Sequence, residues 1–424
     1  MKDCSRIARR RPPRVAAPKR MRLARSNHPL GRSSSLGAHF GLLVHRGLDE
    51  FAEEVREAVR DATEEILLQP DLVTFKDDLT GSSPDDHTIV AYLANQAGAS
   101  DATVGVLMAD ALAHQIPVLP LSRTSDPGAV SDKLPNLITR INAIDWDARR
   151  GEALAAILAM LGLTEPERRV FLSYFRNEST PLAVQMHTEL AQARFDVFLD
   201  RFTVPPSVDF QKRLEEDLGD KAFLVLIESP GLRTSHWVEH EIAYAHAHRI
   251  GILAVTLSGT ADAELVPSID EAFRVRLHVD DVQATSELTD AALRRLLDRV
   301  EVAHARELRR RREQLIGSLR DKLFVDGCTC EPVGDWAVLA TAPGRRSAVF
   351  LITPRRPRPE DLYALHLVHL NASVAVGAEL NAAVVHETEH IAEEQLALLR
   401  WIGEPRQFEA MLLRGCVLLE DPAA

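Results

Sequence analysis

The first part of the chain alternates between short apolar runs and longer segments with helical periodicity. The pattern predicts strands at 39–47, 72–75 and 116–121, helices at 48–68 and 89–97, and a strand followed by a helix within 103–113. A polar loop containing Gly, Ser and Pro is predicted at 76–88. Such alternation is typical of a parallel sheet with helices on its faces.

A second block repeats the alternation. It predicts strands at 170–174, 195–199, 222–228 and 250–257, and helices at 181–193, 210–218 and 235–248. The segment 222–228 is the most apolar run and is expected to form a central strand. Residues 116–119 match 250–253 at an offset of 134 residues, and 42–45 falls near 171–174 at an offset of about 129. These matches indicate a faint duplication of two α/β blocks.

The remainder of the chain begins with a long charged helix, predicted at 288–323 and including the run Arg309–Arg312, which we interpret as a link between domains. Short strands and helices then alternate to the end. The boundaries predict five parts: a disordered tail at 1–38, α/β domains at 39–165 and 166–285, a helical linker at 286–323, and a C-terminal α/β or α+β domain at 324–424.

Charge is unevenly distributed over the 424 residues. The chain carries a formal net charge of −12, yet residues 1–36 hold 11 Lys/Arg and a single acid, Asp3. An acidic body argues against nucleic acid as the main partner, because phosphate binding needs clustered cations. No apolar run approaches the length of a membrane span, and the tail lacks the apolar core of a secretory signal. Four scattered cysteines suit a reducing interior, so a cytoplasmic location is expected.

Polar side chains follow the predicted strands of the second block. Ser173, Tyr174 and Arg176 lie at the end of the first strand, and Asp200 follows the second. In an open parallel sheet, ligands bind beyond the carboxyl ends of the strands. Further along, Trp237 and Glu241 are one helical turn apart on a predicted helix, and Ser235 is a plausible N-cap for it. An acid beside an indole at this rim could engage a ribose and its base.

In order along the chain, the segments FLSY, VFLD with its following loop, LVLIESP and SxWVxxE resemble a bacterial Toll/interleukin-1 receptor (TIR) domain over about 120 residues. The resemblance implies a flavodoxin-like parallel sheet. It also makes the first block a TIR-like or Rossmann-type domain. Aligned through the strand at 250–253, the position of Glu241 falls on Leu107, so the first block would lack the catalytic acid.

Many bacterial TIR domains are NAD⁺ glycohydrolases and others are assembly modules. The resemblance implies that Glu241 is the catalytic carboxylate and that Trp237 lies at the nicotinamide site. It places the family's mobile loop at 201–209, where Pro206-Ser207 replaces the common Pro-Gly. Breaking the C–N bond creates an oxocarbenium-like sugar that a fixed anion stabilises. No metal or cofactor is required, and NAD⁺ is the substrate.

The remaining assignments follow from the same chemistry. Arg176 is a candidate partner for the pyrophosphate, and Ser173 and Asp200 are candidate hydrogen-bonding groups at the rim. Tyr174 and Phe210 are further candidate substrate contacts. The resemblance also implies self-association, or pairing with other TIR domains, and a bacterial immune or signalling role. A non-enzymatic TIR interaction module is the alternative from a different class.

A third alternative comes from the C-terminal part. His386 and His390 form an HExxH match with Glu387 between them, and Glu409 lies downstream as a possible third zinc ligand. Residues 381–385, however, favour a strand leading into the motif. The predicted order of a helix, two strands, a helix and a strand also fits a restriction-nuclease-like fold. The acidic-x-Lys signature of an active nuclease is missing from 349–353.

Overall fold

The described part of the chain contains three five-stranded sheets, each with its own helices. The computed structural model describes residues 39–67, 72–76, 87–114, 116–164, 168–199, 210–333, 336–388, 391–416 and 418. The predicted tail at 1–38 and the predicted loop at 201–209 lie outside the described residues.

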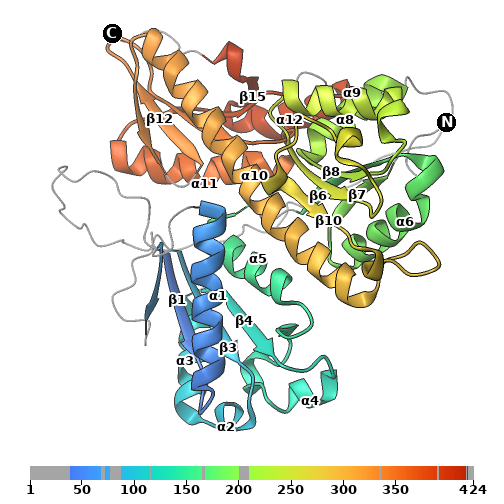
Figure 1. Cartoon of the computed structure of the whole chain (residues 1–424). Helices are drawn as coiled ribbons and strands as arrows, with labels where there is room; N and C mark the ends of the chain where they lie inside the picture. The colour runs from blue at the N-terminus through green and yellow to red at the C-terminus, as the bar shows by residue number, and fades with distance from the viewer. Residues whose placement is uncertain are drawn as a thin grey trace, which may run out of the picture. The chain divides into compact units, whose positions relative to one another are not determined.

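The first sheet is parallel throughout, with the strand order β2-β1-β3-β4-β5. Its strands are β1 (His39–Val44), β2 (Val73–Lys76), β3 (His87–Leu93), β4 (Val118–Ser122) and β5 (Ile144–Asp145). Its helices are α1 (Asp49–Leu67), α2 (Gln96–Ala99), α3 (Ala102–Ala113), α4 (Pro127–Ser131) and α5 (Arg150–Met160), with α1 and α5 drawn in Figure 1. This 2-1-3-4-5 order is that of flavodoxin-like folds.

One predicted helix of this block was wrong. The segment 89–97 begins as strand β3, and only α2 at its end is helical. Ile89, Ala91 and Leu93 pack on one face of β3, whereas Val90 and Tyr92 pack on the other. A strand buried on both faces has no polar alternation, so an apolar run of this length does not distinguish it from a buried helix. The segment 103–113 is wholly helical, because Asp101 caps α3 at its first turn.

The second sheet has the same order, β7-β6-β8-β9-β10, and is also parallel. Its strands are β6 (Arg169–Tyr174), β7 (Asp196–Leu199), β8 (Phe223–Glu228), β9 (Gly251–Thr256) and β10 (Arg274–Arg276). Its helices are α6 (Arg176–Gln192), α8 (Phe210–Lys221) and α9 (His236–Ala247). The run at 222–228 is the central strand β8, as its composition predicts.

Strand register makes the two parallel sheets equivalent. The matching ladders are Leu42–Val90–Val118 in the first sheet and Phe171–Leu224–Ile252 in the second. The pairs Val118/Ile252 and Leu42/Phe171 are separated by the two offsets seen in the sequence, 134 and 129 residues. Helices α3 and α9 each have 12 residues and begin at the 134-residue offset. The duplication therefore extends to the helix that carries Glu241.

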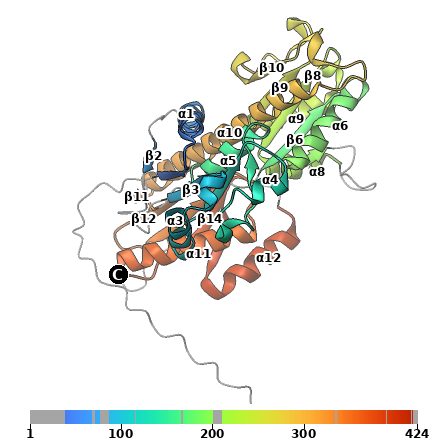
Figure 2. The same cartoon turned by 90° about the horizontal axis from the view of Figure 1, so that it is seen from below.

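The third sheet is mixed, in the order β11-β12-β13-β14-β15. Its strands are β11 (Thr329–Pro332), β12 (Ala337–Thr341), β13 (Ala348–Ile352), β14 (Asn381–His386) and β15 (Phe408–Leu412). The first three are antiparallel, and β13, β14 and β15 are parallel. Helices α11 (Pro359–Val376) and α12 (Glu393–Gly403) complete this part, as Figure 2 shows. The predicted order of elements is present, with β11 in addition.

Helix α10 (Asp290–Val325) is more than the linker predicted at 286–323. Its residues join the apolar cores of all three sheets: Ala305 the first, Leu296 and Val300 the second, and Leu319 and Leu323 the third. Because different turns face different sheets, the helix lacks the single apolar stripe of an ordinary surface helix.

The arginine run of α10 serves this packing. Arg311 donates to the backbone carbonyls of Pro354 and His248, and Arg312 donates to the carbonyl of Ile352 at 3.0 Å. Both arginine side chains are buried. Hydrogen bonds to three backbone carbonyls therefore account for the two buried arginines of the run.

Glycine at 251 is required where β9 meets α10. A Cβ added at Gly251 would lie 2.3 Å from Cβ of Glu307, which is buried on α10. We expect Gly251→Ala to lower the free energy of unfolding by about 1–3 kcal/mol, the usual cost of overpacking. Gly317→Ala is the matched variant, because a Cβ there meets nothing within 4 Å and the position is helical. It should stabilise by about 0.5–1 kcal/mol. Urea denaturation measures both, and equal effects would contradict the close contact.

Among the helices that the structure describes, we find none with the length and apolar character needed to cross a bilayer.

Candidate functional site

Glu241 lies on α9 with its side chain turned into the protein. Ser235 caps this helix, accepting a hydrogen bond from the backbone N–H of Val238 at 3.5 Å. Val238 and Ala245 anchor the same helix in the core of the second sheet. Glu241 is only 6% exposed. A carboxylate rarely becomes buried without a partner, so its contacts decide what it can do.

Ser173 is the described partner of this carboxylate. It lies one residue before the end of β6 and is 3% exposed. Its hydroxyl donates a short hydrogen bond to Oε2 of Glu241. Ser173 pairs with Leu226 of β8 in the sheet. The Ser173–Glu241 hydrogen bond therefore lies beside the neighbouring strands β6 and β8, which are strands 1 and 3 of the domain in chain order. That position is the topological switch point, where sheets of this kind bind ligands. Ser173 and Glu241 are thus in direct contact, and their roles in substrate binding and catalysis stay predictions.

The other residues predicted to contact the substrate differ in how far they are exposed. Trp237 is 49% exposed at the start of α9, one turn before Glu241. Arg176 is exposed at the first position of α6. Tyr174 is buried in the apolar core beneath the rim. Asp200 lies outside the described residues, and Phe210 begins α8 with its side chain outside them.

The equivalent pair in the first sheet has changed. At the offsets fixed by strand register, Leu107 takes the place of Glu241 and Val44 takes the place of Ser173. Among the described residues of the first sheet, the position equivalent to Glu241 therefore carries no carboxylate.

The residues of the HExxH match are not arranged as a helical zinc site. His386 ends strand β14, and Glu387 and Thr388 follow outside any helix. Burial lowers the pKa of His386 to about 4. Glu409 of β15 pairs with Ala383, three residues along the strand from His386, or about 10 Å. His390 lies outside the described residues, and no cluster of three metal-binding side chains occurs within them.

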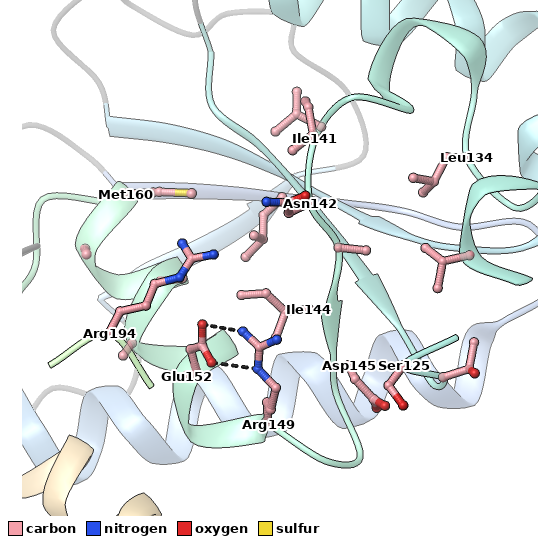
Figure 3. Close-up of a pocket in the computed structure, with 18 of the residues that line it drawn as sticks. Ser125, Leu134, Ile141, Asn142, Ile144, Asp145, Arg149, Glu152, Met160 and Arg194 are labelled. Atoms are coloured by element: carbon pink, nitrogen blue, oxygen red, sulfur yellow. Dashed lines mark hydrogen bonds and ion pairs between the residues drawn. The ribbon is translucent and has the colours of Figure 1, made fainter. Parts of the chain in front are cut away.

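A separate cavity of about 940 Å³ lies beside β5 of the first sheet. Figure 3 shows Arg149 facing Glu152, which accepts its two hydrogen bonds at 2.5 and 2.7 Å, and Arg194 pointing into the same space. Arg168 also lines the cavity and pairs with Glu301 at 3.1 Å. Its walls carry neither Ser173 nor Glu241, so this cavity is distinct from the rim described above.

Sequence patterns did not reveal two polar features of this domain, one at the carboxyl end of β8 and one at the opposite edge of the sheet. Ser229 directly follows β8, is fully buried, and its hydroxyl has no hydrogen-bond partner among the described residues. Asp220, near the end of α8, binds Arg169 and Arg358, each at 3.0 Å. Only the SP dipeptide of the LVLIESP segment could have drawn attention to Ser229. Asp220 and Arg358 are 138 residues apart, and no local pattern links them.

The strand order defines the second sheet as the core of a flavodoxin-like α/β domain, with the Ser173–Glu241 pair buried at its switch point. Residues 170–297 match the family model described as "TIR domain". This segment is thus a TIR domain within the longer chain, and its sheet has the flavodoxin-like order that the sequence predicts.

Comparison with solved structures gives distant likenesses. One is the activated Roq1 resistosome directly recognising the pathogen effector XopQ (TIR domains), at 16% identity and a TM-score of 0.21, covering 22% of this chain and 58% of that one. Another is proximal thread matrix protein 1 from the mussel byssus, at 12% identity and a TM-score of 0.22, covering 64% of this chain and 97% of that one. No curated protein sequence matches the chain.

Proposed function

We propose that the TIR domain hydrolyses NAD⁺ at the bond between nicotinamide and ribose, with Glu241 as the catalytic carboxylate. The observation that carries this proposal is the burial of Glu241 against Ser173 at the switch point of the second sheet. A buried acid at this rim is chemically suited to a substrate that becomes positively charged at its sugar. The four-residue spacing of Trp237 and Glu241 also resembles that of catalytic TIR domains.

The reaction balances without a metal or a redox partner. The C–N bond breaks and its electron pair leaves with nicotinamide, which departs as a neutral base. The ribosyl carbon becomes oxocarbenium-like, and the carboxylate of Glu241 stabilises that charge. Water then attacks the same carbon and loses a proton, giving ADP-ribose, nicotinamide and H⁺. The hydroxyl of Ser173 holds one carboxylate oxygen, so that the acid does not have to reorganise as charge develops.

The other residues have supporting roles in this proposal. Trp237, half exposed one turn before Glu241, offers an indole face for nicotinamide or the ribose. Arg176, exposed at the start of α6, is placed to meet the pyrophosphate. Self-association of the TIR domain is part of the proposal, because family members commonly act as oligomers.

The direct test measures nicotinamide release from NAD⁺ by chromatography, using the full chain over a range of protein concentrations. Release that rises faster than protein concentration supports an oligomeric enzyme. His386→Ala should release nicotinamide like the wild type, because His386 lies in the third sheet. If the folded wild type releases none at any concentration, even with a crowding agent, the enzyme proposal fails. A non-enzymatic TIR interaction module then remains.

Ser173→Ala provides a graded prediction for the same assay. Removing the hydroxyl leaves the carboxylate in place but takes away its hydrogen bond, so kcat should fall about tenfold to a hundredfold. Ser179→Ala is a suitable control, since Ser179 is equally buried but donates to the carbonyl of Phe175 on α6. A Ser173→Ala enzyme with unchanged kcat would show that the Ser173–Glu241 hydrogen bond has no catalytic role.

A further inference from the structure

The first sheet has a cavity at its own switch point. It has a volume of about 360 Å³. It is lined by the end of β1 and the two residues that follow it, by Arg56 of α1, and by the first half of α3. In the order β2-β1-β3-β4-β5, the switch point lies between β1 and β3. Flavodoxin-like folds bind phosphate-bearing ligands at this point. The cavity thus occupies the place in the first domain that the Ser173–Glu241 rim occupies in the TIR domain.

The walls of this cavity are less polar than the TIR rim at the two positions that correspond to Ser173 and Glu241. Val44 and Leu107, which replace Ser173 and Glu241, both line it. The carboxylate and the hydroxyl have thus become two apolar side chains. An apolar wall can pack against a base or a sugar but cannot stabilise a developing positive charge. The cavity is therefore built to hold a ligand without cleaving it.

Basic side chains gather at the same place. His45, Arg46 and Arg56 line the cavity together with Thr103. Three basic groups in a cavity of this size favour an anionic ligand, and planar guanidinium groups are well matched to phosphate oxygens.

Neighbouring acids hold these cations in position without using all of their donors. Arg46 donates from Nε to Asp101 Oδ2 at 2.6 Å and from Nη2 to Thr103 Oγ1 at 2.5 Å. Its Nη1 has no partner in the described part of the chain. Arg56 donates from Nη1 to Glu53 at 3.0 Å, which leaves Nε and Nη2 available.

His45 lies beside the two arginines. Its Nδ1 is buried 3.5 Å from Asp49 Oδ1, so this nitrogen has no surface open to the cavity. The nitrogens of Arg46 and Arg56 that have no described partner form the set of donors that matches the oxygens of one phosphate group.

We propose that this cavity binds a nucleoside phosphate, with the phosphate on Arg46 and Arg56 and the nucleoside against Val44 and Leu107. The ligand is bound intact, because the position of the catalytic acid is occupied by leucine. This proposal does not depend on NAD⁺ cleavage by the TIR domain, and the two proposals are tested separately.

The test is isothermal titration of the full chain with AMP, with adenosine as the probe that lacks the phosphate. AMP should bind the wild type, and adenosine should bind at least about tenfold more weakly, because it makes no charge-assisted hydrogen bond. Arg46→Ala/Arg56→Ala should weaken AMP binding by about tenfold or more. Arg60→Ala is the matched control, since Arg60 is exposed on the same helix α1 and does not line the cavity. It should bind AMP like the wild type.

Two further variants keep the outcome decisive. Removing Arg46 also removes its bonds to Asp101 and Thr103, so Arg56→Ala alone, whose partner Glu53 is exposed, should still weaken binding in a normally folded protein. Glu241→Gln should leave AMP binding at this cavity unchanged, whatever happens to NAD⁺ cleavage. Equal binding of adenosine and AMP, unchanged AMP binding in both Arg56 variants, or no binding of AMP at millimolar concentration would each overturn the proposal.

Discussion

Replacing Glu241 with glutamine is expected to reduce nicotinamide release from NAD⁺ by about a hundredfold or more. Glutamine has the same shape and can still accept the hydrogen bond from Ser173, but it carries no charge. The oxocarbenium-like state would then lose the anion that stabilises it, and losses of this size are usual when a preorganised electrostatic contact is removed. The loss should appear in kcat, because the charge exists only in the transition state.

Glu239→Gln is the control for this prediction. Glu239 lies on the same helix two residues earlier and is exposed, so the change removes the same charge from the domain without altering the buried pair. Release should stay within about twofold of the wild type, as expected for an exposed group. Circular dichroism and thermal unfolding verify that both variants are folded. If Glu241→Gln retained wild-type release, Glu241 would not be the catalytic acid.

The largest expected effect on stability is that of Asp220→Ala. Asp220 is 6% exposed and binds Arg169 and Arg358 at 3.0 Å, with Lys221 at 3.6 Å. Its removal would leave buried cations, including the 4%-exposed Arg169 side chain, without their anion. Breaking a buried ion pair from one side typically costs about 3–5 kcal/mol. Urea denaturation followed by tryptophan fluorescence measures the loss.

Asp196→Ala is the matched variant for Asp220. Asp196 also binds a cation, Lys221, at 2.6 Å, but its side chain is 56% exposed. Its removal should cost less than about 1 kcal/mol, because water screens an exposed pair. Similar losses in the two variants would mean that burial does not strengthen the Asp220 network.

The same network has a definite pH dependence. Burial would raise the pKa of Asp220, but the charges of Arg169, Arg358 and Lys221 outweigh it and leave the pKa below its ordinary value. The stabilisation is therefore fully present above the unfolded-state pKa of ~4 and is lost as pH falls below it. Asp220→Asn should show a smaller loss of stability in this acid range than the wild type does.

The sequence was sufficient to predict the parts of the fold that depend on local patterns. The alternation of strands and helices predicts both parallel sheets, and the position of Ser173 at the end of a strand places it at the rim. The hydrogen bond from Ser173 to Glu241, which lies in the middle of α9 and 68 residues away, is not set by a local pattern. The segment 89–97 was misjudged because a strand buried on both faces has no polar period. The Asp220–Arg358 contact could not be predicted, because its partners belong to different sheets and neither lies in a recognisable motif.

The charged helix α10 also shows how tertiary context overrides a sequence pattern. Glu301 and His304 belong to this charged helix, yet both are buried, and burial raises the pKa of Glu301 to about 7. His304 accepts from the backbone N–H of Arg169 at 3.3 Å and contacts the rings of Phe195 and Phe223 edge-on. Such contacts depend on which sheet each helical turn faces, and that information is absent from the helix itself.

Helix α10 contributes side chains to three separate apolar cores. If the helix unfolds, all three cores lose apolar side chains at the same time. Refolding of the helix on any one core would in turn place its side chains for packing against the other two. Melting should therefore be shared across the three sheets, and a cut within this helix would expose apolar surface on both fragments.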